Sequence, residues 1–239
     1  MHHLSEAVFP ELEGVQRRVR VAARALSRHG LVHAYGHCSE RLDAEHFLVC
    51  AARPMGLIAA GEPGVIVPVF GGLPEGVLGE VRIHQQVYRS RPEVRAVVRS
   101  MPQSVMTLGT ARRTPRPRHG FGAYFGAGVA LWDDPQLVRS DEAAIGLTAR
   151  LGPLAALVMR GNGAVVVADS LLKAVVLTWY LEDAARLELD VLATGLEAQS
   201  ALLDEQACTE RATSTGLIFE RMWDYLSAGD VELDPLASH

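Results

Sequence analysis

The most constraining stretch of this 239-residue chain is the segment 155–193, which encodes two strands and a long helix in succession. Residues 155–159 and 164–168 are short apolar runs, and Gly161-Asn162-Gly163 separates them, as expected for two strands joined at a turn. Ser170 then stands where a helix N-terminus needs a side-chain acceptor, and apolar residues follow along one stripe to about residue 193. Strands placed directly before a long helix predict a sheet that is covered by helices.

The rest of the chain alternates the same two kinds of element. Apolar spacing predicts helices over residues 11–29, 79–90, 104–110, 135–151 and 197–226. Runs bounded by Gly and Pro predict strands at residues 38–42, 47–50, 64–69 and 94–99. We therefore predict an α/β fold in one domain over residues 1–239, with a central, mostly antiparallel sheet and helices on its faces. About ten residues at the N-terminus and about twelve at the C-terminus are expected to be frayed.

Composition bears on the partners and the compartment. Hydrophobic residues make up 49% of the chain and charged residues 21%, and the formal net charge is −5, so nothing favours nucleic acid or an anionic membrane as a partner. No apolar run approaches the roughly 20 residues that span a bilayer, and the start of the chain has no signal-peptide pattern. The three cysteines form no CxxC pair. These features predict a cytoplasmic protein.

Four segments, taken in order, resemble the class II aldolase/adducin family. They are Gly36-His37-Cys38-Ser39-Glu40-Arg41, the Glu80–His84–Tyr88 spacing, residues 91–98, and residues 161–167 with the following 180–186. Their order and spacing cover about residues 30–190. The resemblance implies a three-layer class II aldolase-like fold with helices on both faces of the sheet, a small-molecule substrate and a cyclic homotetramer with sites between subunits.

The resemblance breaks at the metal site. The family usually continues the third segment with His-x-His and has a third histidine before the last strand, but this chain has Arg99, Met101 and Asn162 there. Residues two apart on a strand share a face, so the usual histidines could reach one ion. Arginine has no lone pair to offer, methionine suits copper(I), and an amide is a weak ligand. We therefore predict that the protein uses no metal and no other cofactor.

Phosphate recognition also departs from the pattern of the family's sugar-phosphate aldolases. Those members carry hydroxyl residues just before the catalytic glutamate and a Thr-containing turn earlier in the chain. This chain has Leu78-Gly79 before Glu80, and Ala52-Arg53-Pro54-Met55-Gly56 in the turn. An unphosphorylated substrate is therefore expected.

Three residues are candidates for chemistry, each with a structural alternative. Glu80 matches the family's acid/base, since a carboxylate in an apolar pocket can shuttle a proton, but it could instead charge the first turn of its helix. Arg99 could replace the metal's charge at an enolate or carboxylate oxygen, or merely form a buried ion pair with Glu80. His84, one helical turn after Glu80, is either a proton relay or a structural histidine. Glu80 and Arg99 are expected to face the same cleft.

Further residues are predicted to line or brace that cleft. Ser39 and Asn162 would donate hydrogen bonds to a ligand, and Arg41 would anchor an anion or form a surface salt bridge. His37 and Met101 are predicted as substrate contacts, and Tyr124 and Tyr225 are candidates for a tyrosine acid. The arginine-rich loop at residues 112–128 is either solvated surface or an anion gate.

Two functions remain open at this point. The first is a metal-independent lyase for a small, unphosphorylated carboxylated or carbonyl compound, acting through an enolate-like state by decarboxylation, retro-aldol cleavage or isomerisation. The second is a catalytically inactive member of the family that serves as a binding or assembly module. Retention of Glu80 favours the enzyme, and loss of the three histidines favours the module.

Overall fold

A seven-stranded sheet forms the centre of the structure, a computed structural model that describes residues 8–233. Its strands lie in the order β3 (Val65–Pro68), β2 (His46–Val49), β1 (His37–Arg41), β4 (Ala96–Ser100), β7 (Gly163–Ala168), β6 (Ala156–Met159) and β5 (Ala130–Trp132). Every neighbouring pair is antiparallel except β5 and β6, which run parallel. The predicted mostly antiparallel sheet is confirmed.

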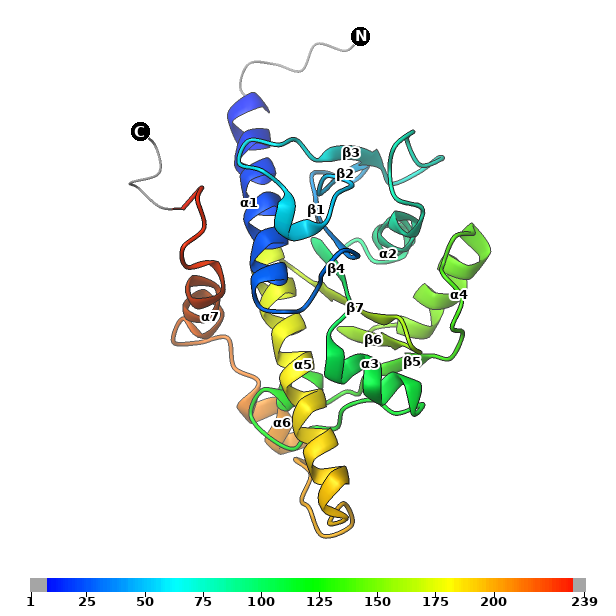
Figure 1. Ribbon diagram of the computed structural model, residues 1–239, viewed down its shortest axis with the longest axis vertical. Helices are drawn as coiled ribbons and strands as arrows, with labels where there is room; N and C mark the ends of the chain where they lie inside the picture. Colours follow the sequence, from blue (N-terminus) through cyan, green and yellow to red (C-terminus); the bar gives the residue numbers. More distant parts are fainter. Residues whose placement is uncertain (1–7, 234–239) are drawn as a thin grey trace.

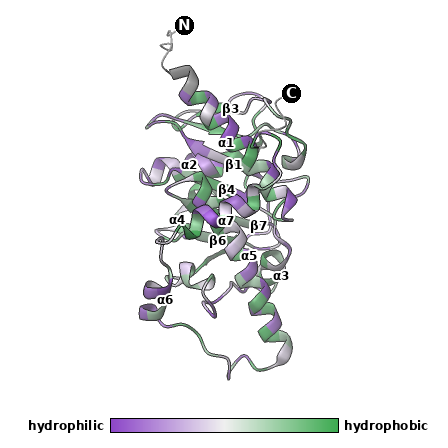
Figure 2. Cartoon of the chain, turned by 90° about the vertical axis from the view of Figure 1, so that its left-hand side faces the viewer, coloured by the Kyte–Doolittle hydropathy of each residue, from purple (hydrophilic) through white to green (hydrophobic). Residues whose placement is uncertain are grey.

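Helices cover both faces of this sheet. The long helices α1 (Val8–Arg28) and α5 (Leu171–Thr194) pack with α3 (Gln103–Thr110) on one face, and α2 (Arg82–Ser90) and α4 (Asp141–Leu151) pack together on the other (Figure 1). Because both faces are covered, β4, β6 and most of β7 are buried at successive positions rather than at alternate ones. Figure 2 shows the result as hydrophobic colour over the central elements and hydrophilic colour over α6 (Glu205–Arg211). The predicted three-layer α/β class is confirmed.

Local sequence sets the ends of the longest helix. The Ser170 side chain accepts a hydrogen bond from the Lys173 amide at the N-terminus of α5. At the other end, Gly195 takes a φ of +70°, a left-handed conformation that costs glycine little. Within the described residues 8–233, neither α5 nor any other helix is long and apolar enough to cross a membrane.

The C-terminal part differs from the prediction of one helix over residues 197–226. The chain instead forms α6 and α7 (Ile218–Ser227). The Asp204 side chain starts α6 by accepting a bond from the Ala207 amide, and left-handed conformations at Gly216 and Leu217 separate the two helices. The prediction also missed β5, which follows a 3-10 turn, η3 (Gly122–Phe125), in the glycine-rich stretch.

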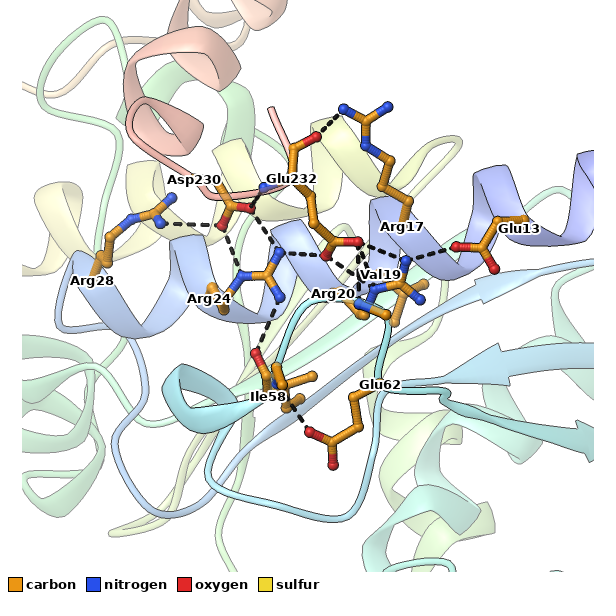
Figure 3. Close-up of polar contacts among 12 residues, drawn as sticks. Glu13, Arg17, Val19, Arg20, Arg24, Arg28, Ile58, Glu62, Asp230 and Glu232 are labelled. Atoms are coloured by element: carbon orange, nitrogen blue, oxygen red, sulfur yellow. Dashed lines mark hydrogen bonds and ion pairs between the residues drawn. The ribbon is translucent and has the colours of Figure 1, made fainter. Parts of the chain in front are cut away.

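Residues 228–233 were expected to be frayed, but they pack against α1. Asp230 and Glu232 bind three arginines that follow each other at every turn of α1, and we call this group the C-terminal clasp (Figure 3). Arg24 lies 2.6 Å from Glu232 and 2.7 Å from Asp230, and Arg20 lies 2.7 Å from Glu232. At the other end of the chain α1 begins at Val8, and residues 1–7 and 234–239 lie outside the described residues.

Candidate active site

A cavity of about 600 Å³ lies at the end of the sheet where β1 begins, β4 ends and β7 begins. Antiparallel pairing brings these three strand ends together, with His37 opposite Arg99 in the register. Two glycines permit the approach of the chain. A Cβ at Gly163, where φ is +88°, would stand 1.9 Å from the Ser100 carbonyl oxygen, and one at Gly36 would stand 2.6 Å from Val32. The volume suits a small molecule.

Glu80, Arg99 and Asn162 meet at this cavity and bind each other. Arg99 Nη2 lies 3.0 Å from Glu80 Oε2 and donates to Asn162 Oδ1 at 2.8 Å. Glu80 Oε1 also accepts from the backbone amide of Val138 at 3.2 Å. Glu80 is supplied by the 3-10 turn η2 (Gly79–Val81), Arg99 by β4, and Asn162 by the residue before β7. The predicted shared cleft is present.

Arg99 is the most unusual member of the group because it is both charged and almost fully buried. Its exposure is 2%, and burial lowers the pKa of its guanidinium, which Glu80 partly offsets. Its Nε and Nη1 atoms are buried and have no hydrogen-bond partner among residues 8–233. Unpaired buried N–H groups are costly and rare in folded proteins, so the hydrogen bonding of Arg99 is incomplete.

The residues at this site do not fit the divalent cation that the family implies. Arg99 places a cation where a ligand should be, and Asn162 Oδ1 already accepts from it. Within residues 8–233, no group of three or more His, Cys, Asp or Glu side chains could hold a metal ion. We derive no step through a metal.

A chain of four buried side chains runs from the cavity to the core. His37 Nδ1 lies 2.7 Å from His84 Nε2, and His84 Nδ1 lies 2.6 Å from Ser39 Oγ. Ser39 Oγ in turn lies 2.8 Å from Tyr88 Oη. Burial lowers the pKa of His37 well below its usual value and that of His84 to about 3, with the nearby Arg99 charge adding to both shifts. Both imidazoles are therefore neutral.

The structure corrects three predicted site residues. His84 and Ser39 are 0% exposed and lie beneath the cavity wall rather than on it. Glu80 belongs to the 3-10 turn that runs into α2 and lines the cavity, whereas His84, four residues later in α2, does not line it. Arg41 points away from the cavity: it donates to the Val94 and Tyr88 carbonyl oxygens, and its guanidinium lies over the Tyr88 ring.

Other predicted residues divide in the same way. His37, Met101 and Asn162 line the cavity as expected. Tyr124 does not: it donates to the Thr213 carbonyl oxygen and packs against Tyr180 and Phe219. Tyr225 lies beside His29. The arginine-rich loop forms ion pairs, with Arg116 and Arg118 on Glu188, rather than facing the cavity.

Several residues that line the cavity were not predicted from the sequence as site residues. Tyr35 and Leu137, which are exposed, and Arg53 and Arg139 stand along its walls. Tyr35 directly precedes the Gly36 motif, and that adjacency was the available signal. Arg139 comes from the segment before α4, whose position no local pattern specifies.

Comparisons with known proteins agree with this architecture. The model of the Class II Aldolase and Adducin N-terminal domain matches residues 17–189. A 3,4-dihydroxyphthalate decarboxylase from a Terrabacter species is 31% identical over 191 residues, covering 73% of this chain and 80% of the relative. A Rhodococcus jostii enzyme of the same name is 27% identical over 202 residues, covering 77% and 83%.

Solved structures show the same fold. An aldolase II superfamily protein from Pseudomonas syringae superposes with a TM-score of 0.77 at 20% identity, covering 91% of this chain and 92% of its own. L-fuculose 1-phosphate aldolase from Glaciozyma antarctica gives 0.74 at 20% identity, covering 95% and 94%. The decarboxylase relatives confirm the expected lyase-like enzyme over the inactive module. The chain belongs to the class II aldolase and adducin family.

Proposed function

We propose that this protein is a metal-independent decarboxylase of a small, unphosphorylated aromatic carboxylate that carries a hydroxyl group beside the carboxylate. The observation that carries the proposal is the Glu80–Arg99 pair at the cavity, with two guanidinium nitrogens of Arg99 that lack a partner among the described residues. The names of the relatives point to 3,4-dihydroxyphthalate as the first compound to try.

The reaction requires a group that accepts a proton and returns it, and a cation near one oxygen of the substrate. Glu80 takes the proton of the substrate hydroxyl, and Arg99 stabilises the oxygen anion that results. Glu80 then returns this proton to the ring carbon that bears the carboxylate, and the oxygen becomes a carbonyl. The bond to the carboxylate breaks, CO2 leaves, and the electron pair restores the aromatic ring and the anion beside Arg99. The product takes up one proton from water. A fixed guanidinium thus replaces the Lewis acid.

The cavity lining supports an unphosphorylated substrate. Leu78 and Gly79 stand before Glu80, and Ala52, Arg53 and Pro54 form the facing turn. No serine or threonine is among the described residues that line the cavity. Rim arginines are well suited to a second carboxylate of the substrate, which the name dihydroxyphthalate contains.

Assembly as a cyclic homotetramer belongs to the same proposal. Tyr35, Leu78 and Leu137 are exposed at the cavity by 69%, 41% and 45%, which suits cover by a neighbouring subunit. Light scattering should give about four times the 25.8 kDa chain mass. A mass of one chain at micromolar concentration would contradict a shared site.

The deciding experiment measures CO2 release from 3,4-dihydroxyphthalate by the wild type and by Glu80→Gln. The substitution keeps the shape and the hydrogen bond from Val138 but removes the proton carrier. We expect turnover to fall by about 10²–10⁴-fold, the usual contribution of general acid/base catalysis.

Glu75→Gln is the matched control, since Glu75 is exposed and does not line the cavity. Its turnover should equal that of the wild type. Phthalate, which lacks the hydroxyl group, should not react. Undiminished turnover in a folded Glu80→Gln variant would overturn the assignment of Glu80.

A further inference from the structure

The role of His37 at the cavity depends on which of its two ring nitrogens carries the hydrogen. Its Nε2 atom is buried and has no hydrogen-bond partner in the part of the chain that the structure describes, as is also true of Arg99 Nε and Nη1. His37 and Arg99 are opposite each other on β1 and β4, so their side chains stand side by side on one face of the sheet. A protonated Nε2 would donate to a ligand, whereas an unprotonated one would accept a proton.

The buried chain behind His37 allows two arrangements of hydrogens in which Ser39 both donates and accepts, because each neutral imidazole carries one N–H. In the first, Tyr88 donates to Ser39, Ser39 donates to His84 Nδ1, His84 Nε2–H donates to His37 Nδ1, and His37 keeps its hydrogen on Nε2. In the second, every bond is reversed, and His37 presents a lone pair to the cavity. If Ser39 instead accepted from both His84 and Tyr88, its own buried hydrogen would be left without an acceptor in this chain.

The two arrangements differ at the far end of the chain. Tyr88 is 1% exposed, and within the described residues its hydroxyl has one hydrogen-bond partner, Ser39 Oγ. The second arrangement makes Ser39 donate to Tyr88, and the hydroxyl hydrogen of Tyr88 is then left without an acceptor. An unsatisfied buried donor costs about 1–3 kcal/mol. The first arrangement leaves no buried hydrogen of these four residues unpaired except the one that faces the cavity.

We propose that Tyr88, Ser39 and His84 are positioning residues that hold His37 as its Nε2–H tautomer, so that His37 and Arg99 together donate to one anionic oxygen of the substrate. This inference rests on the proposed function for the identity of that oxygen, a carboxylate or phenolate. It deepens that function by making His37 a donor rather than a general base. Burial and the adjacent Arg99 keep His37 from becoming a cation.

Long-range proton–nitrogen NMR on 15N-histidine-labelled protein tests the tautomer without any turnover. The wild type should show His37 and His84 both protonated on Nε2, with Nδ1 as acceptor. A signal of His37 protonated on Nδ1 would overturn the proposal and make this residue a base.

Ser39→Ala removes the link between Tyr88 and His84, so averaged shifts from two tautomers are expected at His37. Tyr88→Phe keeps the ring and Ser39, and it should have a smaller effect in the same direction. If His37 keeps the unmixed shifts of one tautomer in Ser39→Ala, the relay does not set the tautomer and the proposal fails.

Phthalate serves as the ligand, because it supplies carboxylates and cannot react by the proposed route. Its addition should move the His37 Nε2–H signal of the wild type and leave in place that of His46, which is half-buried and does not line the cavity. An unmoved His37 signal at saturating phthalate would contradict donation to an anionic oxygen. An Nε2–H tautomer that responds to phthalate in a protein that never releases CO2 would support this inference and refute the proposed reaction.

Discussion

The C-terminal clasp and the active site each contain a buried arginine paired with a carboxylate. They differ in how many of the arginine nitrogens have a hydrogen-bond partner. In the C-terminal clasp, Arg24 uses all three nitrogens: Nε and Nη2 bind Asp230, Nη2 also binds Glu232, and Nη1 donates to the Ile58 carbonyl oxygen. In the active site, Arg99 places Nη2 against Glu80 and Asn162 and leaves Nε and Nη1 unpaired.

The difference separates a structural group from a functional one. The clasp joins α1, the loop at Ile58 and residues 230–232 (Figure 3). Its arginines pair with carboxylates of the protein itself. The active-site group is incomplete by itself within the described residues, and in the proposed function a ligand supplies the missing bonds. Buried polar groups without partners are rare in folded proteins, so incompleteness of this kind marks a site.

The largest expected effect on stability comes from Arg24→Met. This change leaves Asp230, which is buried, without its closest partner, and breaking a buried pair costs about 3–5 kcal/mol. Thermal and urea unfolding should show the loss, while turnover per folded molecule at low temperature stays at the wild-type level. A variant that unfolds like the wild type would contradict the structural role of the clasp.

Arg99→Met should lower turnover more than it lowers stability, the opposite of Arg24→Met. Removing the guanidinium deprives the anion of its donors, which should lower turnover by about 10²–10³-fold if Arg99 acts like an oxyanion-hole donor. The double variant Glu80→Gln with Arg99→Met should recover stability lost in the single variant, because no unpaired charge remains. Wild-type turnover in Arg99→Met would reduce the Glu80–Arg99 pair to a structural contact.

The active site and the C-terminal clasp should lose stability at different pH values. The folded-state pKa values of His37 and His84 are lowered, so their stabilisation is present above the unfolded value near 6.5 and is lost as pH falls below it. Each contributes a slope of about 1.4 kcal/mol per pH unit. The pKa values of Asp230 and Glu232 are also lowered, by Arg24 and Arg20, so the clasp loses stability only below about pH 4.5.

Unfolding curves measured from pH 8 to pH 3 check this separation. Arg24→Met should keep the decline that begins near pH 6.5 and lose part of the steeper decline below pH 4.5. A decline that starts only below pH 4.5 in the wild type would mean that the two histidines are not held neutral.

Metal removal should have the smallest effect, namely none. After dialysis against EDTA, turnover and melting temperature should match the untreated protein, and elemental analysis should find far less than one equivalent of transition metal. Near one equivalent of zinc, manganese or iron, with loss of turnover on its removal, would contradict a guanidinium in the metal's place.

Much of the fold could be predicted from local pattern. Apolar periodicity located α1 and α5, and short apolar runs located β4, β6 and β7, because these elements bury side chains at regular spacing. The split into α6 and α7 was missed, since left-handed conformations at Gly216 and Leu217 outweigh an apolar pattern that continues past them.

The sequence by itself determined the family and the meeting of Glu80, Arg99 and Asn162, because residue type and order carry that information. Only the tertiary structure decided which residues reach the cavity. His37, Ser39 and Arg41 alternate along β1 and so share one face, yet each step of two residues moves about 6–7 Å farther from the strand end. His37 therefore lines the cavity, Ser39 lies beneath it, and Arg41 points to the opposite end of the strand. Whether a residue of β1 reaches the cavity depends on the elements that pack over the strand at that position, and not on the type of residue.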